Sequence, residues 1–152
     1  MGNLTQRSVE IILDNQVASG TYTAGPNFRN YHYCWFRDGS FITYAMDLVG
    51  EHASAARFHD WVVMAINRRA RVFQWVVDQP QTNEPLSSVD LLHIRYTLNR
   101  EDATSSEWLN FQMAGFRTWM WALGEHFSLT SKSLLEAWER AAGLAANYLS
   151  AL

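Results

Sequence analysis

Residues 39–49 read GSFITYAMDLV, a stretch in which apolar residues recur at helical spacing. These apolar residues cover nearly all sides of the helix that the stretch predicts. A helix of this kind is buried by its neighbours on most sides. We therefore expect a central helix with an inner stripe of Ile42, Ala45, Met46 and Val49 and a flank of Phe41, Tyr44 and Leu48.

Four further segments predict helices with one apolar face each. They span residues 4–18, 52–71, 111–127 and 130–152, and Thr130 is a suitable N-cap for the last of them. The pattern of the last segment continues to the end of the sequence without a cap, a glycine or a polar tail. We therefore expect residues 1–152 to be a single, incomplete domain that is part of a longer protein.

The connections between these segments are long. Residues 21–37 predict an extended loop, and residues 78–90, which hold Pro80 and Pro85, predict a turn-rich connection. Apolar residues alternate over 92–98, as in a short strand. Long loops between paired helices favour stacked α-hairpins over a tight four-helix bundle. The predicted fold class is all-α.

Composition excludes several classes of protein. The 152 residues are 48% hydrophobic with a net charge of −3, which predicts one globular domain and gives no electrostatic case for binding nucleic acid. No membrane helix and no signal peptide are evident, so we expect a cytoplasmic chain without a membrane partner. Cys34 is the single cysteine, which excludes an intrachain disulfide. Seven tryptophans predict either a large core or a surface that stacks on sugars.

The densest candidate site is residues 30–41, NYHYCWFRDGSF. Arg37 and Asp38 follow four aromatic residues at the start of the predicted central helix. A guanidinium donates a planar fork of hydrogen bonds and a carboxylate accepts from neighbouring hydroxyls, a combination that suits the end of a sugar chain. Two structural explanations stay open: Asp38 is an ordinary N-cap, and Arg37 pairs with a buried carboxylate.

A second cluster, residues 107–112, precedes the fourth helix. Trp108 could serve as a stacking platform and Gln112 as a hydrogen-bonding group in the same cleft, although a hydrophobic staple at a helix start would look alike. Another pair of residues is a weaker candidate for a functional site. His32 and Cys34 could share a face, but a buried structural thiol is commoner than a nucleophile.

Two further groups of charged or ligating residues have structural explanations. His52 and His59 lie seven apart on one predicted helix, with no third metal ligand evident in the sequence. No metal site is therefore expected. The basic run at residues 68–71 is interpreted as the solvated C-terminal end of a helix.

The first cluster resembles the Tyr-x-Tyr-x-Trp-x-Arg-Asp signature of glycoside hydrolase family 15, which includes glucoamylases, glucodextranases and bacterial trehalases. A second stretch is similar to a later segment of that family: HIRYTL at 93–98, EWLNFQ at 107–112 and FRTWMWAL at 116–123. The two motifs occur in the family's order and together cover most of the chain.

This resemblance implies an (α/α)6 barrel, of which the chain would form the first portion. It also implies inverting, exo-acting hydrolysis of α-glucans or α-glucosides without a cofactor. By resemblance, Arg37 and Asp38 hold hydroxyls of the terminal glucose, Tyr31 and Trp35 line the same pocket, and Trp108 stacks at the neighbouring subsite.

The chain departs from the family pattern in three respects. Inverting hydrolysis needs two carboxylates, and no acidic pair within 1–152 matches the family's acid and base motifs. Glu107 is the only glutamate beside a tryptophan near a candidate cluster. Ala114 and Arg117 stand where an aspartate and a small residue are usual. We therefore expect this chain alone to bind glucose and to lack the catalytic glutamates.

Two other interpretations remain. A non-catalytic helical module could bind carbohydrate or a partner protein, and the exposed edge of an incomplete barrel would favour self-association. Alternatively, the chain is an unrelated helical protein in which Asp38 only caps a helix.

Overall fold

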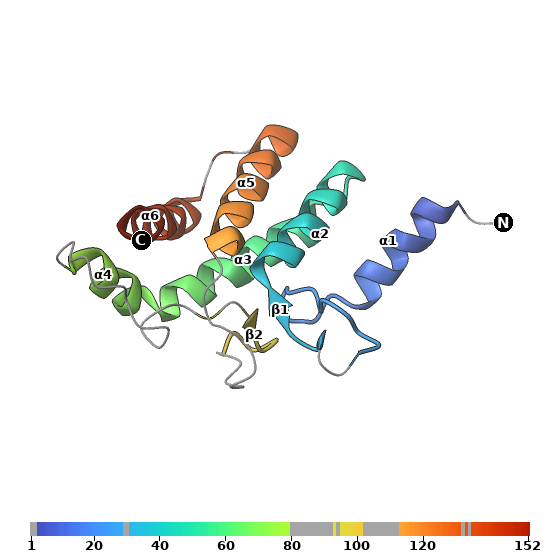
Figure 1. Ribbon diagram of the computed structural model, residues 1–152. Coiled ribbons are helices and arrows are strands. Elements are labelled where there is room, and N and C mark those ends of the chain that lie inside the picture. The colour runs from blue at the N-terminus through green and yellow to red at the C-terminus, as the bar shows by residue number, and fades with distance from the viewer. Residues whose placement is uncertain are drawn as a thin grey trace.

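The computed structural model describes residues 3–28, 31–79, 93, 95–101, 113–131, 133 and 135–152. The described residues are mostly helical, as expected. They form α1 (Leu4–Asp14), α2 (Phe36–Leu48), α3 (His52–Arg68), α4 (Ala70–Asp78), α5 (Met113–Thr130) and α6 (Glu136–Ala151), with the short strands β1 (Cys34–Trp35) and β2 (Arg95–Tyr96) (Figure 1).

The helices pack against one another, and the most extensive packing joins two helices that are not consecutive in the chain, α2 and α5. Three residues join α2 to α3, and α6 follows α5 after a short connection. Helix α2 packs against α5 and α3, and α6 packs against α4 and α3. Because α2 and α5 contact each other near both their first and last turns, they lie side by side and run parallel (Figure 1).

The core between these helices is aromatic. Its largest fully buried side chains include Trp61 of α3, Trp119 of α5 and Tyr148 of α6. Burying a large aromatic ring contributes roughly 2–3 kcal/mol. The many tryptophans of the sequence therefore serve this core in part.

Several expected helix bounds are wrong, and the first helix also ends at Asp14 rather than at residue 18. Helix α2 begins at Phe36 rather than at residue 39, because Trp35 takes the extended conformation of an N-cap (φ −106°, ψ 131°). The segment 52–71 divides at Arg69, and a separate helix, α4, follows. Thr130 is the last residue of α5 rather than an N-cap, because its hydroxyl donates to the carbonyl oxygen of His126 at 2.6 Å within the helix.

The basic run at 68–71 is more than a solvated helix end. Arg68 donates to the carbonyl oxygen of Asn99 at 3.1 Å, and Arg69 donates to that of Arg100 at 3.1 Å. The guanidinium of Arg69 also lies 4.8 Å from the ring centroid of Tyr96. These contacts hold the turn that follows β2 against α3.

Among the described helices, none combines the length and the apolar character that crossing a bilayer requires.

Candidate functional site

The two motif stretches meet in a small antiparallel sheet. Strand β1 pairs with β2 in the register Cys34↔Tyr96 and Trp35↔Arg95. The sheet therefore brings the 30–41 cluster against the 93–98 segment. This pairing confirms the predicted short strand within 92–98 and gives the first motif a rigid support directly before α2.

Aromatic rings line the chain just ahead of α2. The rings of Tyr31 and Trp35 lie 5.8 Å apart at 39°, and Tyr33 meets Trp35 edge-on at 6.1 Å. Trp35 is buried, whereas Tyr31 is 47% exposed. The cluster thus leaves Tyr31 half-exposed to solvent beside a buried aromatic ring, and exposed aromatic side chains can stack on sugar rings.

Arg37 and Asp38 occupy the first turn of α2. Their side chains are 46% and 44% exposed, and Arg37 Nε lies 3.8 Å from Asp38 Oδ2. An exposed pair of this kind contributes little to stability. Its donors and acceptors therefore remain available to a ligand.

The structure contradicts both structural explanations for this pair. The N-cap of α2 is Trp35, which makes no side-chain cap hydrogen bond, and Asp38 lies three residues inside the helix. Arg37 is half-exposed beside Asp38 rather than paired with a buried carboxylate. A carboxylate in the first turn is stabilised by the helix dipole without acting as a cap.

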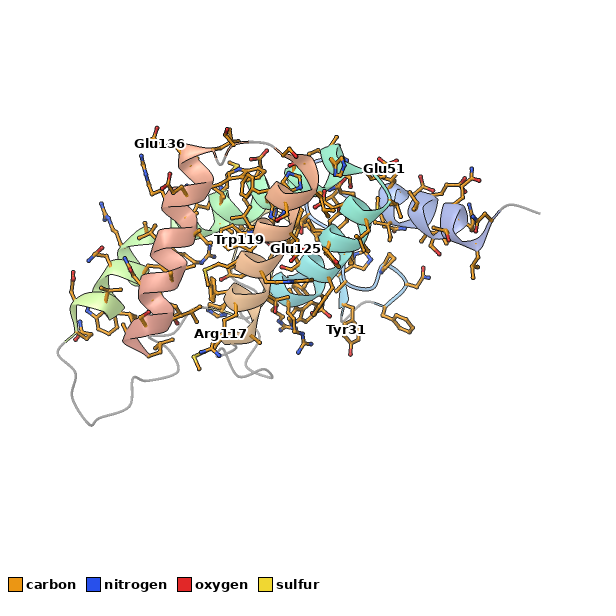
Figure 2. All side chains as sticks on the ribbon, turned by 90° about the horizontal axis from the view of Figure 1, so that it is seen from above. Tyr31, Glu51, Arg117, Trp119, Glu125 and Glu136 are labelled. Atoms are coloured by element: carbon orange, nitrogen blue, oxygen red, sulfur yellow. The ribbon has the colours of Figure 1, made fainter. Side chains whose placement is uncertain are left out.

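The first turn of α5 lies beside that of α2. A Cβ placed on Gly115 would be 3.4 Å from Phe36 Cβ and 3.9 Å from Arg37 N. Ala114 and Arg117, the two departures from the family pattern, are exposed at this same end of α5. Figure 2 shows Arg117 and Tyr31 at one end of the helices and Glu51 and Glu136 at the other.

The remaining candidates have mixed outcomes. Trp108 and Gln112 lie outside the described residues, as does Glu107. Cys34 is fully buried, and this burial raises the pKa of its thiol to about 12, which is incompatible with a thiolate nucleophile. His32 is instead exposed and contacts the carbonyl oxygen of Pro26 at 2.8 Å.

The sequence interpretation missed one residue of this region. Arg95 is buried, and its guanidinium lies 4.6 Å from the ring centroid of Tyr33. A charged side chain within the alternating apolar run 92–98 was the available signal. Arg95 supports the aromatic cluster from the partner strand by a cation–π contact.

The comparisons with known proteins point to glycosidases. The chain is 34% identical over 149 residues to an isomaltose glucohydrolase of Kribbella flavida, a match that covers 97% of this chain and 38% of that protein. A glycosidase variant in complex with glucose superposes with a TM-score of 0.90 at 33% identity, covering 98% of this chain and 40% of that one. A wild-type glycosidase superposes with a TM-score of 0.88 at 33% identity, covering 96% and 39%. No family model matches the chain.

The chain is thus a homologue of glycosidases over nearly its whole length, and it spans about two fifths of the length of these relatives.

Proposed function

We propose that residues 1–152 form the sugar-recognition part of an exo-acting, inverting α-glucosidase of glycoside hydrolase family 15. The fold we propose is the first portion of an (α/α)6 barrel. One observation carries the proposal: the exposed Arg37–Asp38 pair lies in the first turn of α2, directly after Trp35, whose ring packs on Tyr31, in a chain homologous to a glycosidase solved with glucose.

The geometry supports a division of roles. The guanidinium of Arg37 donates to sugar oxygens, and the carboxylate of Asp38 accepts from two neighbouring hydroxyls. Tyr31 covers an apolar face of the terminal ring and Trp35 fixes its position. Trp108 and Gln112 remain predicted ligands at the neighbouring subsite. A site that binds only the terminal unit of a sugar chain accounts for hydrolysis from that end.

Hydrolysis needs a carboxylic acid for the leaving oxygen and a carboxylate that activates water, roughly 6.5–9.5 Å apart for inversion. We propose that both are supplied from outside residues 1–152. The substrate class is α-glucans or α-glucosides. A cytoplasmic location stays a prediction from the sequence.

A chimera tests this proposal. Residues 1–152 would replace the matching 38% of the isomaltose glucohydrolase, and kcat/KM on isomaltose would be measured. We expect a folded, active hybrid in which Asp38→Asn lowers kcat/KM about tenfold to a hundredfold, because a charge-assisted hydrogen bond is lost.

The matched control is Asp14→Asn. Asp14 is the last residue of α1 and is exposed, so its substitution should leave kcat/KM unchanged. A folded but inactive chimera would contradict the proposed role of the chain. An active one that is insensitive to Asp38→Asn would contradict the proposed role of that carboxylate.

A further inference from the structure

A second cluster of polar side chains is buried at the other end of α2. Asp47 follows Asp38 by nine residues, so it lies about 14 Å further along the helix axis. Its fully buried carboxylate contacts Nδ1 of His126 at 2.9 Å and Nδ1 of His52 at 2.8 Å. Because a carboxylate only accepts, each of these imidazoles donates its Nδ1 proton.

His59 of α3 completes the cluster. It is fully buried, with its ring 5.1 Å from that of His126 and 5.3 Å from that of Trp138. Among the described residues, neither of its ring nitrogens has a hydrogen-bond partner. Buried polar atoms are nearly always satisfied, so an imidazole with two unsatisfied nitrogens requires an explanation.

The side chains of the cluster suit a cation. Carboxylate oxygens and imidazole nitrogens are the groups that bind divalent transition metals in proteins. His59 brings two ring nitrogens that no hydrogen bond among the described residues occupies. The cluster therefore holds metal-binding atoms in a fully buried place.

The donors also converge. One ligand atom each from Asp47, His59 and His126 lies within 4.8 Å of the others. A tetrahedral zinc ion with bonds of roughly 2.0–2.2 Å holds neighbouring ligand atoms about 3.3–3.6 Å apart, so Asp47 and His126 would separate by about half an ångström from their present 2.9 Å to bind it. Two imidazoles and a carboxylate form a ligand set typical of Zn²⁺.

We propose that Asp47, His59 and His126 bind a Zn²⁺ ion that ties α2, α3 and α5 together. The ion takes the place of the proton shared by Asp47 and His126 and satisfies the lone pair of His59. His52, with a side chain 36% exposed, donates to Asp47 from the more accessible side of the cluster, and a water completes the tetrahedral coordination. The sequence showed no third ligating residue beside His52 and His59, and the structure places Asp47 and His126 next to His59 from other helices.

Titration with ZnCl₂ tests the proposal. The chain, stripped of metal with a chelator and dialysed, would be titrated by calorimetry and by thermal unfolding. We expect one Zn²⁺ per chain and a rise in Tm with zinc concentration. His59→Phe keeps an aromatic ring among its aromatic neighbours, so it should fold and bind Zn²⁺ at least tenfold more weakly. His32→Gln, which removes an exposed histidine, should bind as the wild type does.

Two results would overturn the proposal: wild-type protein that binds no stoichiometric Zn²⁺, or a folded His59→Phe variant that binds it with unchanged affinity. Should His59→Phe fail to fold by circular dichroism, Co²⁺ as a probe of the wild-type chain decides the matter. Intense visible d–d bands of a tetrahedral site support the proposal, and their absence contradicts it.

Discussion

Gly39 of α2 packs so closely on Phe58 of α3 that no side chain fits between them. A Cβ at Gly39 would lie 2.4 Å from Phe58 Cε2 and 2.5 Å from Cζ. Phe58 is itself fully buried and stacks on Tyr22 and Trp61. The glycine that follows the Arg-Asp pair therefore sets the distance between α2 and α3, and with it the position of the candidate site.

We expect Gly39→Ala to lower the free energy of unfolding by about 1–3 kcal/mol, because the overpacked ring must shift. Urea unfolding followed by circular dichroism measures this. Gly143→Ala is the matched control: a Cβ there meets nothing within 4 Å, so alanine should stabilise α6 by about 0.5–1 kcal/mol. Equal effects of the two substitutions would contradict the packing argument.

Cys34 predicts a loss of stability at alkaline pH. Burial, opposed by a hydrogen bond with Thr21, raises the pKa of its thiol from 9.0 to about 12. The unfolded chain loses this proton first, so the stabilisation is complete below pH 9.0 and declines as the pH rises toward 12, by ~1.4 kcal/mol per pH unit.

Urea unfolding of wild type and Cys34→Ala at about pH 8 and about pH 10 checks this expectation. The wild type should lose more stability than the variant over this interval. Tyr22, whose pKa burial also raises to about 12, affects both proteins alike. Parallel pH profiles would show that Cys34 ionises normally in the folded chain.

How far the sequence predicts this molecule depends on whether the signal is local. Residues 39–49 predict the helix itself but not its buried face. Ala45 and Val49 of the expected inner stripe are exposed, whereas the polar residues Ser40, Thr43 and Asp47 are buried. The helix also begins before residue 39, although Asp38 before a glycine resembles a cap. The extended backbone of Trp35, which β1–β2 pairing imposes, is the actual boundary. The prediction that Thr130 is an N-cap is wrong for a similar reason: a residue type that often caps helices lies here at the end of the preceding helix.

The sequence did not predict which residues far apart in the chain come together in the fold. Arg37 and Asp38 are adjacent, so the pair could be recognised as a motif. Asp47 and His126 are 79 positions apart, and only the parallel packing of α2 and α5 brings them together. Their buried contact with His59 could not be read from spacing on one helix.

We expect residues 1–152 on their own to show no hydrolysis of maltose, isomaltose or trehalose, since no matching pair of acidic residues occurs in this stretch. A glucose-release assay at high protein concentration measures this. Turnover that Glu107→Gln abolishes would identify Glu107 as an acid and contradict the expectation.

We also expect self-association at high concentration. Phe41 is 55% exposed, and its ring lies 5.7 Å from that of Trp121, which is 40% exposed and packs on Tyr44. An aromatic surface of this kind associates in water. Sedimentation velocity should show concentration-dependent growth for the wild type and less for Phe41→Ser/Trp121→Ser. A wild type that stays monomeric would contradict this expectation.

The central claim is that Arg37 and Asp38 bind a terminal glucose unit beside Tyr31 and Trp35. Titration of glucose into the ¹⁵N-labelled chain, followed by NMR, tests it most directly. We predict saturable shifts of the Arg37 Nε–H and Trp35 indole N–H signals, lost in Asp38→Asn and kept in Asp14→Asn. Unmoved signals in the wild type, or the same shifts in Asp38→Asn, would contradict the claim.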